Sequence, residues 1–141
     1  MKEREIRAKV ERVLSDLGCH DKELSILFTD DRRMAELNLR YLGRAGPTNV
    51  LAFPMSDIHA PAGQTPDIET DLLGDVVISV DTAQEEAEEF GETLEQTVDR
   101  LLIHGILHLL GHDHVGAQAQ AALMEREEER LRALVEVTKV S

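Results

Sequence analysis

The sequence contains very little cysteine: Cys19 is the single cysteine among 141 residues. One cysteine cannot form an intramolecular disulfide, and it cannot provide the several thiolates of a Cys-rich zinc module. Both kinds of stabilising framework are therefore excluded. Such cysteine usage is typical of a protein from a reducing compartment.

Long apolar runs are also missing. The longest apolar stretch, Leu101–Leu110, is interrupted by His104 and His108, and it is much shorter than the roughly 20 residues that a membrane-spanning helix needs. The N-terminal segment MKEREIRAKVERVL alternates charged and apolar residues, so it lacks the apolar centre of a secretory signal. We therefore expect a cytoplasmic protein with no membrane partner.

Basic residues are scarce relative to acidic ones, with 15 Lys and Arg against 28 Asp and Glu and a formal net charge of −13. This charge argues against a protein held on nucleic acid or anionic lipid by a uniformly basic surface. Residues 1–44 contain 10 basic and 9 acidic side chains, whereas residues 45–141 contain 5 and 19. Any basic binding surface must therefore draw mainly on the first third of the chain, where the alternative is solvated helix faces of mixed charge.

Length and composition are those of an ordinary globular domain. Hydrophobic residues make up 42% of the chain and charged residues 30%, values that exclude disordered and fibrous proteins. A chain of 141 residues is expected to form one hydrophobic core and to bury roughly two thirds of its unfolded surface. We therefore expect a single domain that spans residues 1–141.

The spacing of apolar residues predicts an α+β fold. Periods of 3.6 residues predict helices over 3–17, from Asp30 or Asp31 to Leu42, and over 82–90, 94–110 and 117–134, and alternating or β-rich runs predict strands over 23–28, 49–53 and 72–80. Residues 54–71 contain three of the four prolines and no apolar period, so they are expected to form a long loop.

Three helix starts carry capping signals, and at the first of them Asp30 or Asp31 can act as the N-cap. Asp81 and Thr93 are predicted N-caps, and Thr93 with Gln96 three residues later forms a capping box. The helix that Thr93 begins is polar at its start and apolar nearly all round from Leu101 to Leu110. Its later turns are therefore expected to be buried.

Four of the six histidines lie within the segment HGILHLLGHDH, residues 104–114. His104 and His108 are four residues apart, so on a helix they project from one face about one turn apart, where two imidazoles can share one metal ion. Gly111 can adopt the left-handed conformation that ends a helix, and the returning chain would bring His114 in as a third ligand.

Three histidines and an open fourth position describe a catalytic zinc site, because structural zinc sites are usually closed by a fourth protein ligand. His112 or Asp113 could provide that closing ligand, and Asp113 is equally suited to orienting a histidine ligand. The spacing His-x-x-x-His-x-x-Gly-x-x-His is that of the metzincin proteases. However, Gly105 stands where those enzymes carry the glutamate that activates water, so peptide hydrolysis by that mechanism is unsupported.

The segment HGILHLLGHDH resembles the pattern H-G-x-L-H-x-x-G-[HY]-D-H of the YbeY family of bacterial rRNA maturation factors. Two further blocks resemble that family in the same order, LNLRYLGRAGPTNVLAFP at 37–54 and LLGDVVISV at 72–80. The resemblance implies a zincin-like single domain, with a small mixed sheet packed against helices. It also implies one zinc ion bound by His104, His108 and His114 at the C-terminal end of the buried helix.

The resemblance further implies a function. Family members are single-strand-specific metallo-endoribonucleases that act in maturation of the 3′ end of small-subunit rRNA and in ribosome quality control. The partners implied are rRNA and the small ribosomal subunit, with ribosomal proteins and a ribosome-associated GTPase as further candidates and with no role for DNA.

The chain departs from the family at one position of interest. An arginine that commonly follows the tyrosine of the first of these two blocks, and that is associated with RNA phosphate, is replaced here by Leu42. Arg44 is the candidate catalytic substitute and Arg40 the second choice, and the alternative is that Arg44 is an ordinary exposed loop residue.

The general base is left open among Asp113, Asp75 and oxygens of the RNA itself. Thr48 and Asn49 could donate hydrogen bonds beside the site or could stabilise a turn. Asp113 is the carboxylate selected as a candidate catalytic residue. Two other functions compete with the nuclease: a non-catalytic ribosome assembly factor stabilised by the metal and, ranked lower, a metalloprotease whose base comes from elsewhere.

Overall fold

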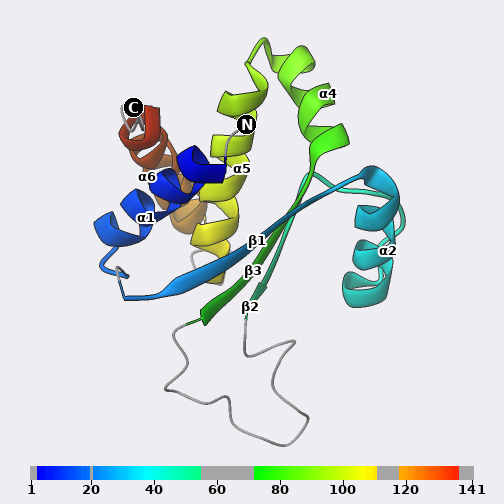
Figure 1. Ribbon diagram of the computed structural model, residues 1–141, viewed down its shortest axis with the longest axis horizontal. Helices are drawn as coiled ribbons and strands as arrows, with labels where there is room; N and C mark the ends of the chain where they lie inside the picture. Colours follow the sequence, from blue (N-terminus) through cyan, green and yellow to red (C-terminus); the bar gives the residue numbers. More distant parts are fainter. Residues whose placement is uncertain (1–2, 20, 55–71, 111–117, 137–141) are drawn as a thin grey trace, which may run out of the picture.

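The computed structural model describes residues 3–19, 21–54, 72–110 and 118–136. Its elements in chain order are α1 (Glu3–Asp16), β1 (Glu23–Thr29), α2 (Asp31–Leu42), β2 (Val50–Pro54), β3 (Leu72–Ser79), α4 (Val80–Phe90), α5 (Leu94–Leu109) and α6 (Gln118–Glu136). They form a small sheet surrounded by helices (Figure 1). The predicted α+β class is confirmed, and the predicted helices and strands are present with ends that differ by at most two residues.

The sheet is mixed, with strand order β1-β3-β2. The central strand β3 runs parallel to β1 and antiparallel to β2, and Val76 pairs with Ile26 on one side and Ala52 on the other. Gly74 at the start of β3 has φ +152° and lies opposite Pro54. A Cβ at Gly74 would lie 2.3 Å from the Phe53 carbonyl oxygen, so the close approach of β2 to β3 requires glycine there.

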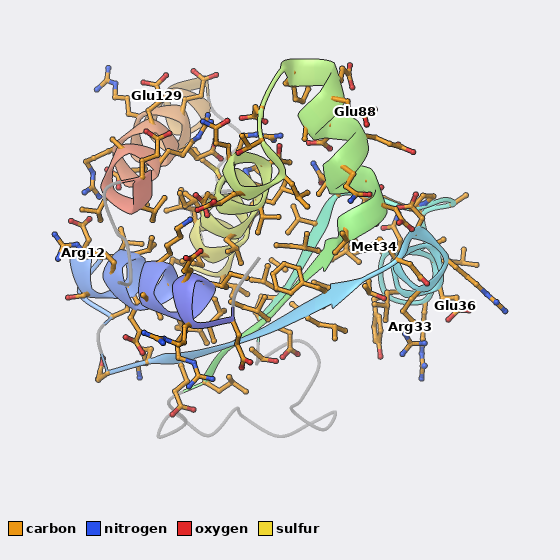
Figure 2. All side chains as sticks on the ribbon, turned by 45° about the horizontal axis from the view of Figure 1, so that its top comes forward. Arg12, Arg33, Met34, Glu36, Glu88 and Glu129 are labelled. Atoms are coloured by element: carbon orange, nitrogen blue, oxygen red, sulfur yellow. The ribbon has the colours of Figure 1, made fainter. Side chains whose placement is uncertain are left out.

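Helices cover both faces of this sheet (Figure 1). On one face Val76 and Ile78 of β3 pack with apolar residues of α1, α5 and α6 in the larger core cluster. On the other face Met34 of α2 packs against strand residues of a smaller cluster, and Figure 2 labels Met34 at that interface. The helix that carries the paired histidines and the helix that precedes Arg44 therefore lie on opposite faces of the sheet.

Helix α5 packs closely against the sheet. Its residues 101–103 and 105–107 are buried. A Cβ at Gly105 would lie 2.9 Å from Val76 Cγ1. This contact gives a physical reason for glycine at the position where metzincins carry their catalytic glutamate, because a carboxylate there would be forced against a valine. Among the described residues, no helix combines the length and the apolar character needed to cross a bilayer.

The capping box that Thr93 and Gln96 form at the start of α5 is confirmed. The prediction of Asp81 as an N-cap is wrong, because β3 runs directly into α4 and the cap is Ser79, whose side chain accepts a hydrogen bond from the Thr82 amide. Asp81 instead accepts a hydrogen bond from the Asp31 amide at 3.0 Å. The N-terminus of α2 is thus fixed against that of α4.

A buried ion pair fixes α1 against α5. Lys9 Nζ lies 3.1 and 3.0 Å from the two carboxylate oxygens of Asp99 and 2.7 Å from Glu95 Oε1. Lys9 and Asp99 are 6% and 7% exposed. Burial raises the pKa of Asp99 and outweighs the opposing effect of Lys9, whereas burial alone would lower the pKa of Lys9 but hydrogen bonds to Glu95 and Asp99 raise it.

Candidate metal centre

Two histidines interrupt the otherwise buried second half of α5. His104 and His108 are partly exposed, whereas Ile103, Ile106 and Leu107 are buried. This difference follows from helical geometry, since residues four apart share one face of the helix. The predicted placement of both histidines on one face is therefore what the structure shows.

The two imidazole rings converge through the same type of nitrogen. His104 Nε2 and His108 Nε2 are 2.8 Å apart, and the ring centroids are 4.3 Å apart with an interplanar angle of 59°. At that distance the two nitrogens are hydrogen-bonded, so one of them carries the hydrogen and the other provides the lone pair. Both Nε2 atoms thus face one small volume beside the helix.

The other nitrogen of His104 contacts a carboxylate from the last helix. His104 Nδ1 lies 2.5 Å from Glu128 Oε1 of α6, and the two side chains are 39% and 23% exposed. A carboxylate has no hydrogen to donate, so Nδ1 is the donor. In a neutral ring the lone pair of His104 is then on Nε2, which is the nitrogen that faces His108.

This arrangement fits a zinc ion. Two nitrogen ligands of one tetrahedral zinc lie about 3.4 Å apart, only about half an ångström more than the observed Nε2 separation. A histidine ligand that donates its second N–H to a carboxylate is the usual arrangement around protein-bound metals. His108 also lies in the last turn of α5, where the helix dipole favours positive charge.

Two histidine ligands alone do not complete a zinc site. The described part of the chain contains no group of three metal-ligating side chains. His114, the predicted third ligand, and Asp113, the predicted catalytic carboxylate, lie outside the described residues, as do Gly111 and His112. The proposed set of three histidines therefore remains a prediction at its third member.

A network of ion pairs beside the histidines joins α4, α5 and α6. Arg100, one turn before His104, donates to Glu86 at 2.9 Å and to Glu92 at 3.2 Å, and Arg132 of α6 donates to Glu92 at 2.9 Å. Burial alone would raise the pKa of Glu92, but hydrogen bonds from Arg100 and Thr97 and the positive charges of both arginines lower it. Glu92 therefore stays ionised and holds the two arginines in place.

The contacts of Asn49 are those of a structural residue. Its Nδ2 donates to Glu86 Oε2 at 2.9 Å, and its Oδ1 accepts from the Val50 amide at 2.7 Å. Thr48 Oγ1 lies 3.5 Å from the same Oδ1. Of the two roles that the sequence left open for this segment, these contacts favour stabilisation of the chain that enters β2.

A groove of about 810 Å³ lies elsewhere, between α1 and β1, and includes neither histidine. Its lining combines apolar residues such as Ile6 and Ile26 with charges of both signs, including Arg7 and Glu23. Nothing in that lining provides a pair of metal-binding nitrogens. The candidate metal site is therefore at the histidine pair of α5 and not in this groove.

Comparison with known proteins identifies the family of the chain. A family model for Endoribonuclease YbeY matches residues 1–135. The chain belongs to the YbeY endoribonuclease family. Relatives named Endoribonuclease YbeY are 42% identical over 129 residues in Syntrophus aciditrophicus and 44% identical over 119 residues in Aquifex aeolicus. These alignments cover 91% and 81% of this chain and 78% and 74% of the relatives.

A solved structure shares the fold of the chain. The solution structure of a Thermotoga maritima protein superposes with a TM-score of 0.66 at 26% identity, covering 94% of this chain and 79% of that one. The resemblance to the YbeY family, drawn from three sequence blocks, is confirmed, and membership supports an endoribonuclease role for the chain.

Arg44, the candidate substitute for the arginine of the YbeY family, is exposed just after α2, which ends at Leu42 and is capped by Gly43. The contacts among the described residues do not join it to either histidine. Arg40 lies 5.4 Å from the centroid of the Tyr41 ring, and Tyr41 packs against Phe53. A catalytic role for Arg44 or Arg40 therefore stays a prediction.

Glu128 is the residue of this candidate site that sequence reasoning missed. It lies on one helical stripe of α6 with Met124, Leu131 and Val135, of which Leu131 and Val135 are buried. The other glutamates between 125 and 129 lie off that stripe. A lone carboxylate on an apolar stripe is the signal that would have identified it, because such a group needs a polar partner in the interior.

Proposed function

We propose that this protein is a zinc-dependent, single-strand-specific endoribonuclease. Its role would be maturation of the 3′ end of small-subunit rRNA and ribosome quality control in the cytoplasm. The observation that carries the proposal is the convergence of His104 Nε2 and His108 Nε2 in a chain of the YbeY endoribonuclease family. The carboxylate of Glu128 on the far nitrogen of His104 supports it.

Each residue has a distinct task in this mechanism. His104 and His108 would hold the ion, with His114 as the third ligand. The chemistry that zinc supplies in such a site is polarisation of a phosphate oxygen and activation of a water molecule. Arg44 would stabilise the negative charge that develops on the phosphate in the transition state. Asp113 would accept a proton or orient a ligand.

The charge distribution suits a substrate that the ribosome presents. Neutral imidazoles add no negative charge to a metal centre, so the centre attracts phosphate. By contrast, residues 45–141 carry 19 acidic side chains against 5 basic ones, which repel RNA from most of the surface. We propose rRNA and the small ribosomal subunit as the partners, with ribosomal proteins and a ribosome-associated GTPase as further candidates.

A metal and cleavage assay tests the proposal. Zinc content and cleavage of a single-stranded RNA are measured for nuclease-free wild type, His108→Ala and the exposed control Glu129→Ala, with the duplex form of the same RNA as a second substrate. We expect wild type and the control to bind zinc and to cleave the single strand faster than the duplex, and His108→Ala to lose both properties. Full cleavage by metal-free His108→Ala would overturn the proposal.

A further inference from the structure

Glu128 lies on the side of α6 that carries the buried apolar residues. Its neighbours on the same stripe of α6, Leu131 and Val135, are 0% and 2% exposed, so Glu128 faces the interior side of the helix. A charged group in such a place is unfavourable unless it is hydrogen-bonded. The contact that satisfies it is His104 Nδ1, at 2.5 Å.

This contact determines what the other side of the His104 ring can do. When Glu128 accepts the Nδ1 hydrogen of the neutral ring, Nε2 of His104 carries the lone pair and is held toward His108 Nε2. A carboxylate partner also raises the basicity of the ligating nitrogen. Without Glu128 the ring could rotate or adopt the other tautomer, and the two Nε2 atoms would no longer be oriented together.

The same contact connects the histidine pair to the packing of α6. Among the described residues, apolar side chains pack α6 against α5, and two polar contacts add to this packing: Glu128 with His104 of α5, and Arg132 with Glu92 in the turn before α5. Of these two contacts, the first alone involves a predicted metal ligand. A ligand that binds the docked arrangement more tightly must, by thermodynamic linkage, stabilise that arrangement by the same factor.

On the basis of the proposed zinc site, we propose that Glu128 is a positioning residue that fixes the tautomer and orientation of His104, and that it couples metal binding to docking of α6. The neighbouring glutamates are not equivalent. Glu127 pairs with Arg130 at 2.7 Å, and Glu129 is exposed on the outer side of α6 (Figure 2). Glu129 is therefore a matched control on the same turn.

Zinc affinity is the first measurement. Wild type, Glu128→Ala, Glu128→Gln and Glu129→Ala are titrated with zinc against a competing chelator, and the zinc-free melting temperature of each is recorded. We expect Glu128→Ala to bind zinc about 10–100-fold more weakly, Glu128→Gln to lose less because its amide oxygen still accepts a hydrogen bond, and Glu129→Ala to match wild type. A purely structural role for Glu128 would lower the melting temperature and leave the affinity unchanged, which would overturn the proposal.

Hydrogen exchange is the second measurement. Zinc is expected to slow amide exchange in α6 of wild type and of Glu129→Ala, with no comparable effect in α2 on the opposite face of the sheet. At zinc concentrations that saturate Glu128→Ala, this slowing in α6 should be lost. Equal slowing in Glu128→Ala and wild type would contradict the coupling. If Glu128→Ala does not fold, Glu128→Leu, which keeps the size of the side chain but cannot accept the Nδ1 hydrogen, is the test, and affinity equal to wild type then overturns the positioning role.

The outcomes also distinguish this proposal from the function on which it rests. The proposed function itself would be overturned if wild type did not bind zinc, or if His108→Ala bound zinc as tightly as wild type. Zinc binding by wild type that requires His108, combined with normal binding by Glu128→Ala, would overturn only the role of Glu128. Neither measurement depends on RNA cleavage.

Discussion

The buried pair of Lys9 and Asp99 allows a quantitative prediction about how α5, the histidine-bearing helix, is held. In Lys9→Met the apolar stem is kept and the charge is removed, so Asp99 stays buried at 7% exposure without its main partner. Removing one member of a buried ion pair costs about 3–5 kcal/mol. We therefore expect the free energy of unfolding to fall by that amount and Tm by roughly 10–17 °C.

The pH dependence of this loss has a defined sign. The pKa of Asp99 in the folded protein is raised above its ordinary value of 3.8 by burial, and loss of Lys9 raises it further. The folded state then binds the Asp99 proton more tightly than the unfolded state, so the contribution of Asp99 to stability becomes less favourable as pH rises through this window. The deficit of Lys9→Met should therefore be largest at neutral pH and should shrink as pH falls toward 3.8.

Urea unfolding followed by circular dichroism at several pH values measures both effects. Arg7→Met on the same helix is the control, because the Arg7–Glu3 pair is 70% and 88% exposed and should contribute at most about 0.5 kcal/mol. The double variant Lys9→Met, Asp99→Leu should recover much of the lost stability, since no buried charge is left unpaired. A cost of Lys9→Met equal to that of Arg7→Met, or one independent of pH, would refute this reasoning.

Further predictions concern the site and its partners. Gly105→Ala should destabilise the fold by about 1–3 kcal/mol, because the added Cβ would lie 2.9 Å from Val76 Cγ1; unchanged urea unfolding would argue against this packing. Arg44→Ala should slow cleavage by at least about tenfold with zinc retained, and unchanged kinetics would direct attention to Arg40. Free single-stranded RNA should bind with a Kd of about 10⁻⁶ M or weaker at physiological salt, so nanomolar binding of arbitrary RNA would contradict the charge argument.

Local patterns were sufficient to predict most of the fold. The apolar pattern of an element indicates which of its faces is buried, because burial creates the periodicity. This holds for α1, where Val10, Val13 and Leu14 are buried, and for the β-rich run of β3. The prediction failed at Asp81 because β3 and α4 adjoin without a linker, so the last strand residue, Ser79, is the cap. Propensity alone does not distinguish two capping residues that lie two positions apart.

The candidate site was predictable only where its members lie within one helix. His104 and His108 are separated by one turn, so their spacing alone placed them together. Glu128 is 24 residues away, and its contact depends on how α6 packs on α5, which no local pattern specifies. The excess of acidic residues after residue 44 does not single out one glutamate with a different task.

The most direct test of the account is made in the host cell. The protein is depleted, the 3′ ends of small-subunit rRNA are mapped, and rescue is attempted with wild type and with His108→Ala. We expect unprocessed 3′ ends that wild type restores and His108→Ala does not. Normal ends after depletion, or equal rescue by His108→Ala, would contradict a metal-dependent nuclease built on His104 and His108.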